Sequence, residues 1–167
     1  METISEIDQI AEEIARRLIE RGESVAVAES AAGGLISAAL LGVAGASAYY
    51  KGGVVVYTTD GKQRLAGLTR EALEANRSAT VPHTALLAHA IRDRLGASWG
   101  IAETGAAGPT GNRYGDAAGH AALAVSGPIE RAEVIETGQS DRRQNMAAFA
   151  LAALRLLRRA LEQRSTE

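Results

Sequence analysis

The sequence predicts a layered α/β/α fold with a mixed, mainly parallel sheet, and three observations support this fold class. Short apolar runs typical of buried strands alternate with longer stretches of helical periodicity. A glycine-rich turn follows the first of these runs, where a strand is expected to pass into a helix. The last two predicted strands follow each other directly, which indicates a hairpin and therefore an antiparallel part of the sheet. We expect residues 1–167 to form a single domain, because domains commonly contain about 100–200 residues.

Apolar spacing and helix caps predict the elements of the first half of the chain. Before Gly22, a natural C-cap, apolar residues recur at helical spacing at Ile7, Ile10, Ile14 and Leu18. The next elements are a buried strand over 24–28, a buried helix over 35–43 and a strand over 54–57. A short helix over 60–66 and a second one capped by Thr69 and running through Asn76 complete this half.

The second half is predicted from similar signals. Pro82 suits the first position of a helix that runs to Leu95 and stops at Gly96. The remaining elements are, in order, a strand over 99–102, a glycine-rich loop over 105–119, strands over 121–125 and 132–136, and a long helix over 141–163.

Composition excludes several classes of function. The net charge is −2 and no basic stripe is present, so we expect no nucleic-acid partner. The chain contains no cysteine, which excludes thiol nucleophiles and thiolate metal sites. The histidines lack metal-ligand spacing, and we expect His83 and His89 only to decorate one helix. We therefore predict no metal and no cofactor. Without a signal peptide or an apolar run of about 20 residues, the chain is predicted to be cytoplasmic, with no membrane partner.

Two similar glycine loops are the candidate ligand site. The segment "AESAAGG" over 28–34 follows the first strand, and "AETGAAGP" over 102–109 follows a later one. Each offers a carboxylate, a hydroxyl and glycines that allow backbone N–H groups to approach a ligand. Ligands bind at strand ends of this kind in α/β folds, although alanine-rich turns without a function would have a similar sequence. Neither loop matches a P-loop or a Gly-x-Ser-x-Gly nucleophile elbow.

Four segments that occur in order carry a resemblance to a known family. They are "AESAAGG", "GVAGASAYYKGGVVVYTTDGKQRLAGL", "TGAAGPTG" and "SDRR" before the last helix. Together they resemble the C-terminal domain of the CinA competence/damage-inducible proteins, whose stand-alone members are nicotinamide-nucleotide amidases. The resemblance implies metal-independent hydrolysis of the carboxamide of nicotinamide mononucleotide to nicotinate mononucleotide and ammonia. It also implies a catalytic serine at Ser30 and a catalytic lysine at Lys62, with further site residues at Tyr57, Ser47, Thr104 and Arg142.

The residues allow a mechanism of this kind. An amide hydrolase needs a nucleophile, a base and donors for the oxyanion. Since no histidine is suitably placed in the sequence, a lysine of lowered pKa must act as the base. Lys62 is favoured over Lys51, the only other lysine, because Lys62 follows the strand on the expected ligand side. Ser30 would attack the carboxamide carbon, and Tyr57 would help to position the reacting groups or to relay the proton.

The remaining candidates would bind the substrate. Backbone N–H groups around Gly33 and Gly34 would stabilise the oxyanion or contact phosphate. Thr104, Gly105 and Gly108 would form the facing wall. Arg142, at the start of the last helix, would bind the 5′-phosphate, although neighbouring Arg143 offers the same charge. Glu29 is either a structural acceptor or a group that orients Lys62.

Departures from the family pattern leave three hypotheses open. Ala31 and Ala32 replace the family's Cys and Thr, the loop over 112–120 lacks a Lys-Pro, and Met146 replaces a second arginine. The chain is therefore expected to be an active nicotinamide-nucleotide amidase, an amidohydrolase of the same scaffold for another small amide, or a non-catalytic nucleotide-binding or regulatory protein. The long final helix also predicts a homo-oligomer, specifically a dimer.

Overall fold

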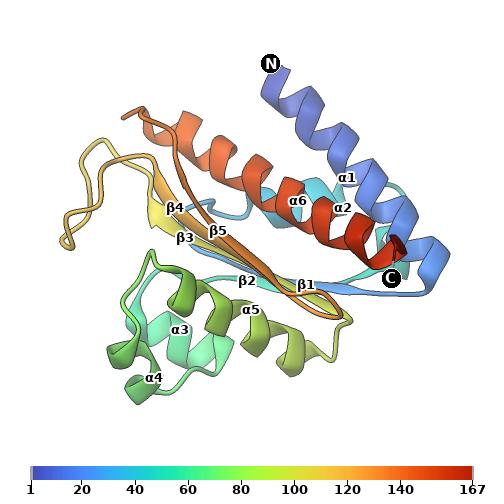
Figure 1. Cartoon of the computed structure of the whole chain (residues 1–167), viewed down its shortest axis with the longest axis horizontal. Helices are drawn as coiled ribbons and strands as arrows, with labels where there is room; N and C mark the ends of the chain where they lie inside the picture. Colours follow the sequence, from blue (N-terminus) through green and yellow to red (C-terminus); the bar gives the residue numbers. More distant parts are fainter. Residues whose placement is uncertain (1, 167) are drawn as a thin grey trace.

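The structure, a computed structural model, describes the backbone of residues 2–166 and the side chains of residues 6–164. Five strands form one sheet in the order β2-β1-β3-β4-β5, with helices on both faces (Figure 1). The β2, β1 and β3 strands run parallel, and the β3–β4 and β4–β5 pairs are antiparallel, so the predicted fold class is confirmed. The elements are α1 (Glu2–Arg21), β1 (Val25–Glu29), α2 (Leu35–Leu41), a 3₁₀ helix (Ala46–Ala48), β2 (Tyr50–Val55), α3 (Thr59–Ala66), α4 (Arg70–Ala75), α5 (Val81–Leu95), β3 (Trp99–Ala106), β4 (His120–Ser126), β5 (Arg131–Glu136) and α6 (Arg142–Thr166).

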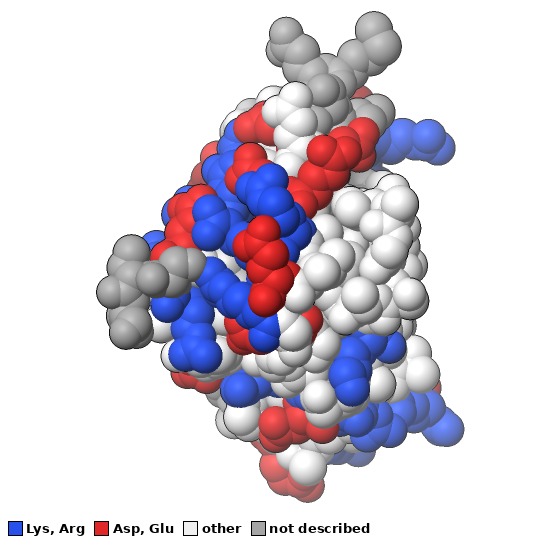
Figure 2. Space-filling view, turned by 90° about the vertical axis from the view of Figure 1, so that its right-hand side faces the viewer, with Lys and Arg blue, Asp and Glu red and all other residues white. Residues whose placement is uncertain are grey.

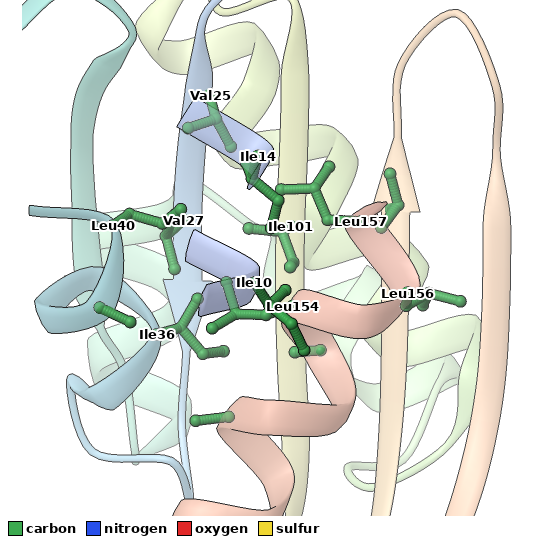
Figure 3. Packing of buried hydrophobic residues seen from close by; sticks show 14 of the residues in the cluster. Ile10, Ile14, Val25, Val27, Ile36, Leu40, Ile101, Leu154, Leu156 and Leu157 are labelled. Carbon is green, nitrogen blue, oxygen red and sulfur yellow. The ribbon is translucent and has the colours of Figure 1, made fainter. Parts of the chain in front are cut away.

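Two hydrophobic cores lie on opposite faces of the sheet. The larger one is enclosed by α1, α2 and α6, and Ile14, Ile36 and Leu154 are fully buried within it (Figure 3). On the other face α5 packs Leu87 and Ile91 onto the alanines of β1 and β3. Burial of one such Leu or Ile side chain contributes about 1.5–3 kcal/mol, so these faces hold the strand ends in fixed positions.

The β2 strand begins and ends earlier than the predicted strand over 54–57. It covers Tyr50–Val55, and Gly52 and Gly53, which precede the predicted strand, lie inside it. A Cβ at Gly53 would lie 2.9 Å from Ser37 Oγ, so this glycine allows α2 to approach the sheet. As a consequence Tyr57 lies outside β2, in the connection to α3, with 65% of its surface exposed.

The β3 strand is longer than predicted and includes Thr104 and Gly105. Antiparallel pairing with β4 sets Gly105 opposite Ala121 and Thr104 opposite Ala122. A Cβ at Gly105 would lie 2.6 Å from the His120 carbonyl oxygen, so the glycine is required by the pairing of the two strands. The predicted glycine-rich loop is correspondingly shorter and begins after Ala106.

Charged side chains of both signs alternate where α1 and α6 run together (Figure 2). Arg158 of α6 pairs with Glu13 of α1 at 3.5 Å, and Arg17 pairs with Glu162 at 3.9 Å. Arginines of the last helix therefore lie beside acidic partners and form no separate basic patch on this described part of the surface. Among the helices of residues 2–166, none combines the length and the apolar character needed to cross a bilayer.

Candidate active site

The candidate site lies where β1 ends beside β3. Glu29, the last residue of β1, is in register with Glu103 of β3, and Ser30 follows Glu29 directly. Both carboxylates are completely buried, and Ser30 is 8% exposed. The parallel pairing of β1 with β3 therefore brings together the two loops that the sequence singles out.

Glu29 is a structural acceptor, which resolves the alternative left open by the sequence. Its two carboxylate oxygens accept hydrogen bonds from the N–H groups of Ile36 at 3.0 Å and Ser37 at 2.9 Å. These N–H groups belong to the first turn of α2 and have no partner within the helix. Glu29 thereby fixes the start of α2 against the end of β1.

Glu103 holds the loop that carries Ser30. Its Oε2 accepts hydrogen bonds from the N–H groups of Ser30 at 3.0 Å and Ala32 at 2.9 Å. Its Oε1 is buried and has no hydrogen-bond partner among the described residues. Burial raises the pKa of the Glu103 carboxyl to about 7, although the two N–H groups act to lower it. The sequence places this carboxylate in the second glycine loop, but sequence reasoning gave Glu103 no role of its own in the site.

Lys62 extends from α3 into the interior and is 4% exposed. Its Nζ donates a hydrogen bond to Ser78 Oγ at 3.0 Å. Burial lowers the pKa of the Lys62 amine, and the negative charge of Glu103 opposes this shift by raising it. The buried position agrees with the requirement that a catalytic lysine must lose its proton readily.

Ser30 and Lys62 both interact with Glu103, Ser30 through a hydrogen bond and Lys62 through its charge, but they do not bond to each other. Ser30 donates its backbone N–H to Glu103, and the charge of Lys62 interacts with that of Glu103. Within residues 6–164 no hydrogen bond joins the Ser30 hydroxyl to the Lys62 amine, whose bond goes to Ser78 instead. Sequence reasoning missed Ser78, because nothing in the neighbouring residues relates it to Lys62.

The side chains of Tyr57 and Arg142 are hydrogen-bonded to each other next to the second glycine loop. Arg142 donates one hydrogen bond to the Tyr57 hydroxyl at 3.1 Å and another to the Gly108 carbonyl at 2.6 Å. Three residues predicted to belong to the site, from three distant parts of the sequence, are therefore in contact. The guanidinium also lines a groove of about 890 Å³ beside Leu35 and Met146, but Ser30 and Lys62 do not line it.

The glycines of the first loop are needed for its path. Gly33 and Gly34 have φ values of 67° and 102°, a region that other residues rarely adopt. A Cβ at Gly33 would lie 2.6 Å from the terminal methyl of Met146. The Gly33 N–H donates to the Ser30 carbonyl at 3.1 Å, whereas the Gly34 N–H has no partner among the described residues. Of these two expected oxyanion donors, only Gly34 is free of a backbone partner.

Thr104 and Ser47 occupy different surroundings. Thr104 is buried, accepts a hydrogen bond from the Ala79 N–H at 3.1 Å, and has its Oγ1 2.6 Å from that of Thr84. It therefore connects β3 to the start of α5. Ser47 is exposed on the 3₁₀ helix and forms no side-chain hydrogen bond with another candidate residue in the described part of the chain.

The expectation that His83 merely decorates α5 is wrong. His83 is 2% exposed, and its Nδ1 donates to the Asn76 carbonyl at 2.8 Å, which leaves Nε2 as a buried acceptor without a described partner. Burial, together with the positive charge of Lys62, lowers the pKa of His83 to about 4. Helical periodicity in the sequence places His83 on a helix, but it does not show which face of that helix packs against the sheet. Residues 6–164 contain no group of three or more His, Cys, Asp or Glu arranged to hold a metal ion.

The fold and site define an α/β domain with a buried cluster of hydroxyl, amine and carboxylate groups at its strand ends. The model of the CinA C-terminal domain matches residues 7–161, and the chain belongs to this family. A CinA-like protein of Anaeromyxobacter sp. (strain K) is 39% identical over 92% of the chain, and one of Parasynechococcus marenigrum is 38% identical over 91%. The chain spans less than two-fifths of the length of these relatives, 38% and 36% respectively.

Solved structures of the same superfamily have the same fold. The competence/damage inducible protein of Agrobacterium tumefaciens is 31% identical with a TM-score of 0.87, and the match covers 95% of this chain and 96% of that one. The CinA superfamily protein of Klebsiella pneumoniae 700603 is 26% identical with a TM-score of 0.88, covering 94% and 98%. The resemblance drawn from the four sequence segments is thus confirmed at the level of the family.

Proposed function

We propose that the chain is a nicotinamide-nucleotide amidase of pyridine nucleotide salvage, which hydrolyses the carboxamide of nicotinamide mononucleotide to nicotinate mononucleotide and ammonia. The observation that carries this proposal is the buried Lys62 amine, whose charge interacts with that of Glu103, the residue that holds the Ser30 loop. A binding module gains nothing from burying an amine of lowered pKa near a serine, whereas an amidase needs such a base.

In the proposed reaction Ser30 Oγ attacks the carboxamide carbon while the proton of its hydroxyl passes to Lys62. The oxyanion forms near the Gly34 N–H, which has no protein partner in the described residues. When the carbon–nitrogen bond breaks, the lysine returns a proton to the leaving amine and ammonia departs. Water then hydrolyses the acyl ester on Ser30 by the reverse proton path.

Arg142 and Tyr57 are proposed to bind the nucleotide. The Arg142 guanidinium is bonded to a hydroxyl and a carbonyl and to no carboxylate among the described residues, so its charge is not neutralised locally. A 5′-phosphate would accept charge-assisted hydrogen bonds from it. Tyr57 is exposed and would supply a hydroxyl and a ring face to the ligand.

One observation favours a second candidate, ligand binding without turnover. Lys62 bonds to Ser78 and not to Ser30, and Glu103 occupies the N–H groups of Ser30 and Ala32. Ammonia release from nicotinamide mononucleotide, measured with a coupled dehydrogenase assay, separates the two. Turnover by the wild type and its loss in Ser30→Ala would support the amidase, whereas saturable binding of the nucleotide with no ammonia would support the second candidate. Ammonia from another small amide alone would support the broader amidohydrolase hypothesis.

A homo-dimer and a cytoplasmic location stay predictions. Leu154, Leu157 and Leu161 of α6 are buried against the core, so they are not available to a second subunit. Leu35 and Leu41 of α2 are instead exposed. Light scattering on the purified chain would give the solution mass, and a monomer at micromolar concentration would contradict the dimer.

A further inference from the structure

Ser78 is the hydroxyl that the Lys62 amine contacts. It lies in the connection between α4 and α5, is partly buried, and accepts the Lys62 hydrogen bond at 3.0 Å. A hydroxyl and an amine at this distance have the geometry of a proton donor and its base. Direct proton transfer from Ser30 to Lys62 gives the Ser78 hydroxyl no role.

The backbone beside Ser78 is held in an unusual conformation. Ala79 has a φ of 61° and is the only non-glycine residue with a left-handed φ in the described backbone. Its N–H donates to Thr104 Oγ1 at 3.1 Å, and its carbonyl accepts from His120 Nε2 at 2.8 Å. A strained residue costs about 1–3 kcal/mol and persists only where its surroundings fix it, as two buried side chains do here. The position of Ser78 is therefore imposed by the fold.

Two consecutive residues of β3 bind the backbone at Ser30 and the backbone next to Ser78. Glu103 holds the backbone N–H of Ser30, and the next residue, Thr104, holds the backbone N–H of Ala79 beside Ser78. Because β1 and β3 are paired in register at Glu29 and Glu103, these attachments lie at the same level of the sheet. The backbone at Ser30 and the backbone beside Ser78, the partner of Lys62, are thus both anchored at neighbouring positions of β3.

We propose that Ser78 is a further catalytic residue that relays the proton of Ser30 to Lys62, an inference that rests on the proposed amidase function. As Ser30 Oγ forms its bond to the carboxamide carbon, its proton passes to Ser78 Oγ, and the Ser78 proton passes to the neutral Lys62 amine. When the carbon–nitrogen bond breaks, the Lys62 ammonium returns a proton to Ser78, and Ser78 gives its own proton to the amide nitrogen, which leaves as ammonia. No oxidant or co-reactant is needed.

Two readouts on three variants test the relay. The variants are Ser78→Ala, Ser78→Thr, which keeps a hydroxyl, and Ser98→Ala as the matched control. Ser98 is also a serine that accepts a hydrogen bond at 3.0 Å, but it lies at the opposite end of β3, before Trp99. The first readout is kcat and KM for ammonia release from nicotinamide mononucleotide. The second is the rate at which a fluorophosphonate labels the protein, with the labelled serine located by peptide mass mapping, which needs no substrate.

We expect Ser78→Ala to lower kcat and the labelling rate of Ser30 together, by about 100- to 1,000-fold, because a positioned acid–base group contributes this much. KM should stay within about twofold, and Ser78→Thr should recover at least about a tenth of the wild-type kcat. Ser98→Ala should match the wild type in both readouts.

Three results would overturn the relay. They are Ser30 labelling within about threefold of wild type in Ser78→Ala, a change in KM alone, and a label that appears on Ser78 or on no serine of the wild type. If the wild type is labelled at Ser30 but releases no ammonia, the proposed substrate is wrong, and the labelling rates of the variants still decide the relay. A Ser78→Ala protein that does not fold is replaced by Ser78→Gly, judged by the same criteria.

Discussion

Glu103 holds the backbone N–H of Ser30 in a hydrogen bond of 3.0 Å, so a carboxylate inside β3 sets the position of the proposed nucleophile. The same oxygen binds the N–H of Ala32, and the other oxygen has no described partner. A buried carboxylate in this situation affects the stability of the fold, and its charge raises the pKa of Lys62. Glu103 is therefore the residue through which folding and the proposed chemistry are most closely connected.

Glu103→Gln should change how stability depends on pH. The pKa of Glu103 is raised from 4.5 to about 7 in the folded state, so the folded chain retains a proton that the unfolded chain releases. The free energy of unfolding of the wild type should therefore fall relative to that of the variant as pH rises from 4.5 to 7, by about 3 kcal/mol, and then level off. Urea unfolding at several pH values measures this difference. Exposed Glu71→Gln is the control, and parallel curves for wild type and Glu103→Gln would contradict the assignment.

The pH dependence of activity should report the Lys62 amine. Burial lowers the pKa of Lys62, and kcat/KM should rise with pH as the amine loses its proton, because only the neutral amine accepts one. Since the charge of Glu103 raises the pKa of Lys62, Glu103→Gln should move this rising limb to lower pH. Lys62→Arg should abolish the limb together with the activity, because arginine does not act as a base. A limb that moves to higher pH in Glu103→Gln would show that another group titrates.

Arg142→Ala should remove the preference for a phosphorylated substrate. A charge-assisted hydrogen bond contributes about 1.5–3 kcal/mol, so kcat/KM for nicotinamide mononucleotide should fall by about 10- to 100-fold. The value for nicotinamide riboside, which has no phosphate, should change little. Arg143→Ala is the matched control on the neighbouring residue, and an equal loss there would assign the phosphate contact to Arg143 instead.

Gly100→Ala should destabilise the fold where α5 crosses the sheet. A Cβ at Gly100 would lie 2.1 Å from the Ala88 carbonyl oxygen, which belongs to the backbone and has little freedom to move. We expect a loss of about 1–3 kcal/mol in the free energy of unfolding. Gly61→Ala in α3 is the contrasting variant, because its Cβ meets only Thr58 Oγ1 at 3.3 Å and alanine favours helix. Equal stability of the two variants in urea would show that α5 can shift away from β3.

Local signals in the sequence predicted the elements well, because caps and turns depend on neighbouring residues. The Thr69 hydroxyl accepts from the Ala72 N–H as expected of an N-cap, and Gly22 follows α1 with a φ of 64°. The boundaries of β2 and β3 were wrong because Gly53 and Gly105 serve contacts with α2 and β4, which are distant in the sequence. No local pattern distinguishes such a glycine from one in a turn.

The sequence predicted only part of the candidate site, because some of its contacts join residues that are distant in the chain. Motif residues such as Arg142, Tyr57 and Gly108 do meet, since each follows a strand or begins a helix at the same end of the sheet. Other features of the site depend instead on how α3, α5 and β3 pack. They are the bond between Lys62 and Ser78, the burial of His83 and the binding of Ser30 by Glu103. These contacts arise only in the folded chain.

The central claim is that Ser30 is acylated by the carboxamide substrate. Rapid quenching of the enzyme with excess nicotinamide mononucleotide, followed by peptide mass mapping, tests it most directly. We predict that the Ser30 peptide gains the mass of the nucleotide less that of ammonia, and that Ser30→Ala neither gains this mass nor releases ammonia above the background. Ammonia release by Ser30→Ala at the wild-type rate, with no adduct on the wild-type peptide, would contradict the claim.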